Sequence, residues 1–119
     1  MTKRPQSKQA SGTGESSTTD ADKALLRSAY AADTKGVIAA LEDGANVNAA
    51  DQATGLTALH IAVGTNNLHL TRILVEDWEA GLGPDAKGRW PTLIAAEAQV
   101  DETLADFIVM AEYQALGTT

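Results

Sequence analysis

The chain has 119 residues, a length expected for one domain, and 44% of its residues are hydrophobic although only 4% are aromatic. Because 22 residues are alanine, we expect a core of small side chains between closely packed helices. The 16 Asp and Glu residues outnumber the 9 Lys and Arg residues, and the formal charge of -7 argues against nucleic acid or an anionic membrane surface as the main partner. A basic or mixed-charge protein is the expected partner.

The absence of cysteine excludes disulfides, thiolate metal sites and a thiol nucleophile. The first residues lack the apolar run of a secretory signal, and no stretch approaches the ~20 apolar residues of a membrane-spanning helix. We therefore expect a cytoplasmic protein that contacts no membrane.

Residues 1–20 are rich in Ser, Thr, Gly, Lys and Gln, and they offer almost no side chain that folding would bury. Ordering them would cost backbone entropy without a hydrophobic return. We expect a disordered N-terminal tail at 1–20, followed by one folded domain at 21–119.

Apolar residues recur at helical spacing from Asp20 onward. Asp20 or Asp22 is expected to cap the first helix, and Gly44 suits the left-handed C-terminal cap of the second. Pro91 and Asp101 suit the first residue and the cap of two later helices. The stripe expected to be buried on the first helix consists of Leu25, Leu26, Ala29 and Ala32.

The helical pattern repeats along the chain. Aligning Gly55 with Gly88 gives a period of 33 residues, whereas Leu25 lies 34 residues before Leu59, so we expect one extra residue in the turn at 51–55. A period of this length, with two helices and a polar turn, is typical of a stacked solenoid. The repeats are expected at about 21–54, 55–87 and 88–116.

Residues 57–62, with the sequence TALHIA, resemble the TPLHxA opening of the ankyrin repeat family. Residues 44–51 resemble the family's GADVNAxD ending, and residues 85–89 resemble its DxxGx turn. The resemblance extends from 21 to about 116. It implies an all-α ankyrin-repeat solenoid of three helix-turn-helix repeats with short β-hairpin-like turns, in a small protein that we expect to be bacterial.

Two segments depart from the family pattern. Trp78 stands where the family has a capping glycine, and residues 79–84 differ from the usual turn, so we expect a second turn of different shape. Residues 90–93 replace the opening of the third repeat, which indicates a divergent terminal cap. We expect Trp78 and Tyr113 to cover the core, and Trp90 either to do the same or to anchor a partner.

No residue pattern indicates catalysis, a metal or a cofactor. The chain has two histidines, and a catalytic site would need partners converging on one of them. The family resemblance implies instead that His60 links Thr57 to neighbouring backbone groups. The glycine-rich segment 81–88 lacks the Gly-Lys-Ser/Thr ending of a phosphate-binding loop. We expect no enzymatic activity.

The family resemblance implies that the concave surface of inner helices and turn tips binds a protein partner. Carried onto this chain, the expected binding residues are Tyr30, Gln52, Thr54, Leu56, Lys87, Arg89, Trp90 and Glu97. Replacing Arg89 by alanine is expected to weaken binding with little change in stability.

Three roles are compatible with such a surface. The first is an adaptor that is a monomer before it binds its partner. The second is a stoichiometric inhibitor or immunity protein of a basic enzyme or toxin. The third is a structural homodimer formed by the last helix pair, which a mass measurement at several concentrations would distinguish from the other two.

Overall fold

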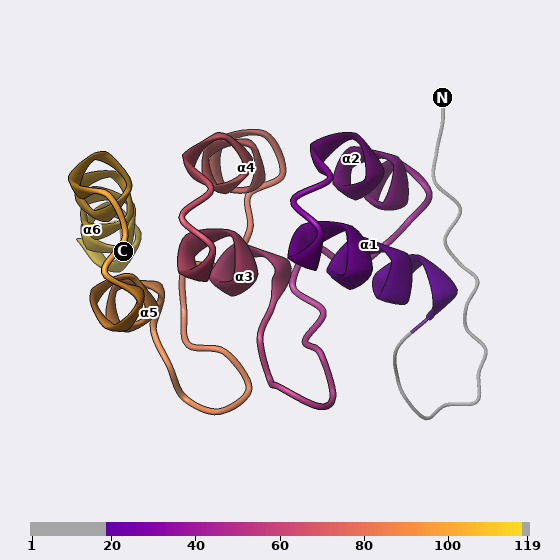
Figure 1. The fold of residues 1–119 in the computed structure, drawn as a ribbon, viewed down its shortest axis with the longest axis horizontal. Coiled ribbons are helices and arrows are strands. Elements are labelled where there is room, and N and C mark those ends of the chain that lie inside the picture. Colours follow the sequence, from indigo (N-terminus) through magenta and orange to yellow (C-terminus); the bar gives the residue numbers. More distant parts are fainter. Residues whose placement is uncertain (1–18, 118–119) are drawn as a thin grey trace.

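The computed structural model describes residues 19–117, which form three helix pairs standing side by side (Figure 1). The pairs are α1 (Asp20–Tyr30) with α2 (Thr34–Glu42), α3 (Ala58–Gly64) with α4 (Leu68–Arg72) and its π-helical continuation η1 (Ile73–Asp77), and α5 (Pro91–Ala98) with α6 (Glu102–Gly117). The predicted all-α solenoid of three repeats is confirmed. The predicted tail lies outside the described residues except for its last two positions.

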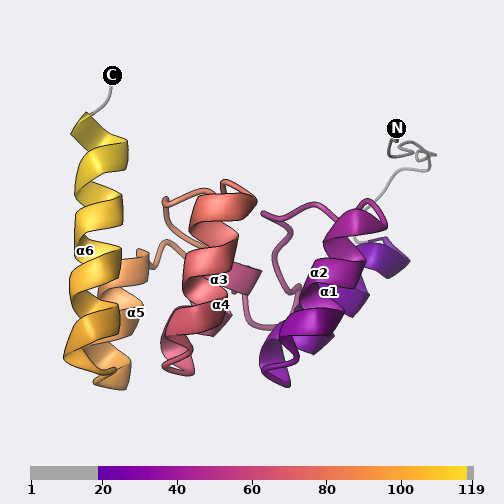
Figure 2. The same ribbon diagram turned by 90° about the horizontal axis from the view of Figure 1, so that it is seen from above.

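The helices form two rows. Helices α1, α3 and α5 make an inner row, and α2, α4 and α6 make an outer row (Figure 1). The loops between successive pairs project from the inner row, away from the outer helices. Seen from above, the pairs stand next to one another, with α6 at the end opposite to α1 (Figure 2).

The core runs through all three pairs as one cluster of small and aliphatic side chains. Helix α3 contacts α1 on one side and α5 on the other. Ala29, Ala58 and Ala62 are fully buried, and their short side chains let these inner helices approach closely. The largest fully buried apolar side chains are Leu25, Leu59, Leu70, Leu74, Leu104 and Ile108.

Asparagine side chains connect corresponding positions of successive repeats. The amide of Gly81 donates to the side-chain oxygen of Asn48 at 2.8 Å, and the amide of Asp101 donates to that of Asn66 at 2.9 Å. The partners are 33 and 35 residues apart. These separations are close to the repeat period seen in the sequence, so each bond joins one repeat to the next.

The first helix begins one residue earlier than the sequence suggested. Its cap is Thr19, not Asp20 or Asp22, because the Thr19 hydroxyl accepts from the Asp22 amide at 3.0 Å. The Asp22 carboxylate in turn accepts from the Thr19 amide at 3.2 Å and from the Asn46 amide at 2.8 Å. This capping box also ties α1 to the turn after α2. At the other end of α1, Ala32 lies beyond the helix at φ 59° and is exposed, contrary to prediction.

The second outer helix ends differently from the first. Helix α2 is followed by Gly44 at φ 103°, as predicted. After α4 the chain forms the π-helical turn η1, and a π turn accommodates one extra residue. The left-handed position consequently falls on Glu79 at φ 53°, while Trp78 is the C-cap. The expected change of turn shape is confirmed, and so is the packing of Trp78 against the core.

The last inner helix receives its cap from the last outer helix. Pro91 is at the start of α5, as predicted, but Trp90 at the cap position forms no side-chain cap hydrogen bond. Instead, the Glu112 carboxylate of α6 accepts from the Thr92 amide at 2.7 Å and from the Thr92 hydroxyl at 3.0 Å. A carboxylate at a helix N-terminus satisfies an amide that has no intrahelical partner and interacts favourably with the helix dipole.

We therefore expect Glu112→Ala to lower the free energy of unfolding by about 1–2 kcal/mol, because the Thr92 amide loses its acceptor. Urea denaturation followed by circular dichroism measures this loss. Glu97→Ala, which removes an exposed carboxylate from α5, is the matched control and should change stability far less. Equal stability of the Glu112 and Glu97 variants would contradict the capping role.

Helix α6 exposes several large apolar side chains to solvent. Tyr113 is 71% exposed, so the prediction that it covers the core is wrong. Val109, Met110 and Leu116 are more than half exposed as well. Among residues 19–117, no helix is both long and apolar enough to cross a membrane.

Candidate partner-binding surface

Two hairpin-like loops project from the inner row. We call residues 50–57 the first hairpin and residues 83–90 the second. In the first, the Asp51 amide donates to the Leu56 carbonyl at 2.8 Å, and in the second the Asp85 amide donates to the Arg89 carbonyl at 2.8 Å. The bonded residues are five positions apart in the first hairpin and four positions apart in the second, so the extra residue predicted at 51–55 is confirmed. Within the described residues the only β pairing is a bridge between Ala50 and Thr57.

Equivalent glycines shape the two hairpins and let them meet. Gly55 and Gly88 both adopt φ 82°, a left-handed conformation that glycine adopts at little cost. The amide of Ala86 donates to the Gly55 carbonyl at 2.9 Å and so joins the second hairpin to the first. The two loops therefore form one connected surface.

A buried carboxylate organises the second hairpin. Asp85 is 6% exposed, and its Oδ1 accepts from the amides of Lys87 and Arg89, both at 2.9 Å. The Arg89 guanidinium completes the site with an Nε–Oδ2 distance of 2.8 Å and an Nη2–Oδ2 distance of 2.7 Å. Burial alone would raise the pKa of Asp85, but the hydrogen bonds from Arg89 and Lys87 hold it below its ordinary value.

Arg89 also reaches the first hairpin. Its Nη2 donates to the Thr54 carbonyl at 2.7 Å, which joins residues 35 positions apart. Arg89 thus holds the two hairpins together. The expectation that Arg89→Ala leaves stability unchanged is therefore revised, because this side chain supports the surface as well as contributing to it.

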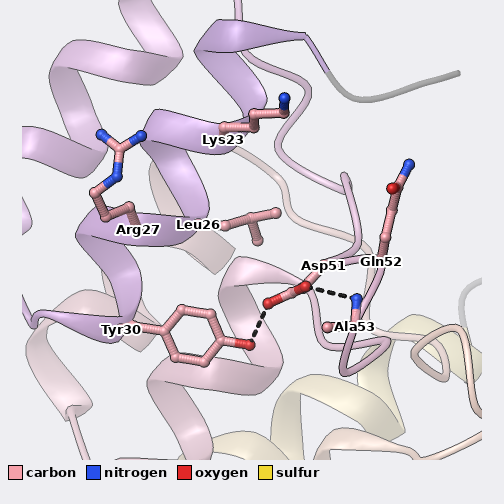
Figure 3. Close-up of a pocket in the computed structure, with 7 residues that line it drawn as sticks. All are labelled: Lys23, Leu26, Arg27, Tyr30, Asp51, Gln52 and Ala53. Carbon is pink, nitrogen blue, oxygen red and sulfur yellow. Dashed lines mark hydrogen bonds between the residues drawn. The ribbon is translucent and has the colours of Figure 1, made fainter.

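Tyr30 links the end of α1 to the first hairpin. Its hydroxyl donates to Asp51 Oδ2 at 2.7 Å (Figure 3). The same hydroxyl lies 2.7 Å from the Thr54 hydroxyl. Burial raises the pKa of Tyr30 above its ordinary value, which is already well above neutral pH, and the phenol is therefore a hydrogen-bond donor. The hydrogen bond from Tyr30, with one from the Ala53 amide, lowers the pKa of Asp51. The ring is fixed at its hydroxyl end yet remains 43% exposed.

The structure brings some of the eight predicted binding residues together and separates others. Tyr30, Thr54 and Arg89 are connected by hydrogen bonds, whereas Glu97 is exposed on α5 and bonds to none of the other seven in the described part of the chain. Leu56, predicted as an exposed contact, is only half-exposed and packs against the core cluster. The three remaining residues are exposed at the loops or at the start of α5: Gln52, Lys87 and Trp90.

An open groove of about 480 Å³ lies between α1 and the first hairpin (Figure 3). We call it the α1 groove. Its two cationic residues, Lys23 and Arg27, were not among the predicted binding residues. Their spacing with Tyr30 nevertheless places all three on one face of a helix. The residues that line the groove are Lys23, Leu26, Arg27, Tyr30, Asp51, Gln52 and Ala53.

His60 has the structural position that the family resemblance implied. It is 1% exposed, and its Nδ1 lies 2.7 Å from the Thr57 hydroxyl, which caps α3. Nε2 makes no hydrogen bond of good geometry within the described residues, although the backbone of Arg89 and of Gly83 is close enough to favour protonation. Burial outweighs these groups and the nearby Asp85, and the pKa of His60 is lowered.

Because the folded state lowers the pKa of His60, the unfolded chain binds more protons below the ordinary histidine value of about 6.5. The free energy of unfolding should therefore fall as the pH drops from 7.5 through 5. A further fall is expected below about 4, where protonation removes the stabilising charges of Asp85 and Asp51.

Urea denaturation at a series of pH values tests this dependence, with His60→Gln as the comparison. The variant is expected to be less stable at neutral pH and to show a flatter profile between pH 7.5 and 5. A wild-type stability that rises between pH 7.5 and 5 would contradict the assignment of a neutral, buried histidine.

The surface offers binding groups more than reactive ones. In the described residues, no three His, Cys, Asp or Glu side chains gather closely enough to hold a metal ion. The best-connected charged groups, Asp85 and Arg89, neutralise each other inside the second hairpin. What remains accessible is a row of polar and aromatic side chains on a connected backbone.

Comparison with known proteins agrees with this architecture. Residues 54–89 match the sequence model of the ankyrin repeat family, and no curated protein matches the chain. The match begins in the first hairpin, includes α3, α4 and η1, and ends in the second hairpin. Ankyrin repeats are in general protein interaction modules and are typically non-enzymatic. The match identifies an ankyrin repeat at residues 54–89, and a helix pair of the same arrangement stands on each side of it.

Proposed function

We propose that the chain binds a partner protein through the concave surface formed by its inner helices and two hairpins, without catalysing a reaction. The observation that carries this proposal is the hydrogen-bonded chain from Tyr30 through Thr54 to Arg89. These groups are held in place before any partner arrives, so binding would require little additional ordering. A monomer that captures one partner is the simplest form of this function.

Two aromatic side chains supply anchors for such binding. Tyr30 is 43% exposed and is hydrogen-bonded to the first hairpin, and Trp90 is 38% exposed at the end of the second hairpin. Large aromatic residues at the centre of an interface contribute about 2 kcal/mol or more each when they become buried by a partner. Lys87 and Glu97 are exposed as well and would provide polar contacts to a partner.

Capture from an extract of the source cells tests the proposal. The immobilised chain is compared with Trp90→Ala, which removes an aromatic next to the second hairpin. Tyr113→Ala is the matched control, because it removes an exposed aromatic from α6 instead. We expect the specifically retained protein to be lost with Trp90→Ala and kept with Tyr113→Ala. Loss of the retained protein with Tyr113→Ala but not with Trp90→Ala would place the binding surface on α6.

An inhibitor or immunity protein of a basic enzyme or toxin is a narrower form of the same function. The formal charge of -7 supports it, because opposite charges speed the encounter of two proteins. Association should then slow as salt is raised, while dissociation changes less. A captured protein that is an enzyme, and that loses activity in a one-to-one complex, would select this form over an adaptor.

A structural homodimer is the second candidate, and the exposed apolar side chains of α6 favour it. Val109, Met110, Tyr113 and Leu116 are 51–71% exposed. Apolar patches of this kind mark association surfaces. Sedimentation equilibrium over a wide concentration range decides the matter, since a constant monomer mass would rule out the dimer.

We also propose a cytoplasmic location, since a chain without cysteine needs no oxidising compartment in order to fold.

A further inference from the structure

We propose that the α1 groove binds an acidic segment of the partner protein, with Lys23 and Arg27 receiving its carboxylates. The inference rests on the proposed function and adds the chemistry of one part of the partner. An acidic ligand at this groove also contrasts with the formal charge of -7, which by itself favours a basic partner.

The cationic residues are placed on the groove by the helix itself. Lys23, Arg27 and Tyr30 are exposed and follow one another at helical spacing along α1. The opposite face of α1 is buried in the core through Leu25 and Ala29. Both residues line the groove between α1 and the first hairpin (Figure 3).

These two cations are not neutralised within the described structure. Among residues 19–117, ion pairs join Arg72 to Glu76 and Arg89 to Asp85, and neither Lys23 nor Arg27 takes part in one. Asp51 also lines the groove and is ionised, because the hydrogen bonds from Tyr30 and the Ala53 amide lower its pKa, so the charged residues of the lining leave a net charge of +1. The α1 groove is thus a site of local positive charge in an acidic protein.

The dimensions suit a few side chains of an extended segment. A volume of about 480 Å³ falls within the range of ~300–1,000 Å³ typical of ligand sites. The Tyr30 hydroxyl is already hydrogen-bonded, which leaves the exposed part of its ring for apolar contact between the acidic side chains of a partner. A nucleic acid fits less well, because the surrounding net negative charge would repel a continuous row of phosphates.

Selection from a library of random peptides displayed on phage tests the inference on the full chain. Peptides enriched on the wild type are expected to be rich in Asp and Glu, and their affinities are then measured by fluorescence polarisation. Arg27→Glu should weaken the acidic peptides by about tenfold or more, and raising the salt concentration should weaken them as well.

Lys35→Glu is the matched control, because it changes the net charge equally but lies on α2, and it should bind these peptides like the wild type. Urea denaturation of both variants verifies that they are folded. Enriched peptides without acidic preference, acidic peptides that bind Arg27→Glu as tightly as the wild type, or tighter binding of a single-stranded oligonucleotide would each overturn the inference.

The outcomes separate this inference from the proposed function. Peptides that lack acidic residues but lose affinity with Trp90→Ala would support binding at the second hairpin while contradicting the role of the α1 groove. Acidic peptides that respond to Arg27→Glu support both.

Discussion

Replacing Leu59 by alanine is expected to lower the free energy of unfolding by about 2–5 kcal/mol. Leu59 is 1% exposed on α3, the inner helix that packs against both α1 and α5. Its loss would leave a cavity between repeats that rigid neighbouring helices fill only in part. Because a domain of this kind has about 5–15 kcal/mol of stability in total, a large part of it depends on this one side chain.

Urea denaturation measures the loss, with Leu93→Ala as the control. Leu93 is the same residue type on the neighbouring inner helix but is 43% exposed, so its truncation should cost much less. If the two variants were equally stable, the stacking of α3 between its neighbours could not be the main source of stability.

The second large effect is expected for Asp85→Ala, at about 2–4 kcal/mol. The substitution removes the acceptor for two backbone amides and for the Arg89 guanidinium at once. Without that carboxylate, the second hairpin loses the group that fixes its shape, and Arg89 loses its partner. Arg89→Ala should cost less, because Asp85 would keep both backbone amides.

The matched control for Asp85→Ala is Asp51→Ala, which changes the equivalent residue of the first hairpin. Asp51 accepts from the amide two residues ahead, as Asp85 does, but it lies in the first hairpin without an arginine partner and is more exposed. The urea concentration at the unfolding midpoint should therefore be lower for Asp85→Ala than for Asp51→Ala. Equal loss in both variants would contradict the role assigned to the buried ion pair.

The repeat period was sufficient to predict the fold class, because each helix pair buries its apolar face against the next and must repeat the same spacing. The extra residue of the first hairpin was also predictable, from the 34-residue distance between Leu25 and Leu59. The motif at residues 57–62 indicated the family and the contact between Thr57 and His60.

Other features depend on contacts between distant residues. Glu112 caps α5 from 20 residues away, and nothing in the local sequence of α6 signals that its carboxylate turns inward. The π turn η1 is followed by a left-handed residue at Glu79 rather than at Trp78, whereas the sequence predicted only that this turn would differ in shape. Thr19 was overlooked because two aspartates follow it and are equally good caps by residue type.

The candidate binding surface was predictable only in outline. Transferring family positions identified Tyr30, Thr54 and Arg89, but it could not show that hydrogen bonds join them. It also did not select Lys23 and Arg27, which line the α1 groove, since the family pattern does not specify the polar face of the first helix. The charge of that face becomes informative only when the first hairpin is seen opposite to it.

The most direct measurement is the footprint of the captured partner on the chain, read from backbone amide shifts in the NMR spectrum of the labelled protein. We expect the largest changes in the first and second hairpins and on the exposed face of α1. Changes confined to α2, α4 and α6, with the hairpins unaffected, would contradict the central claim that the inner surface is where a partner binds.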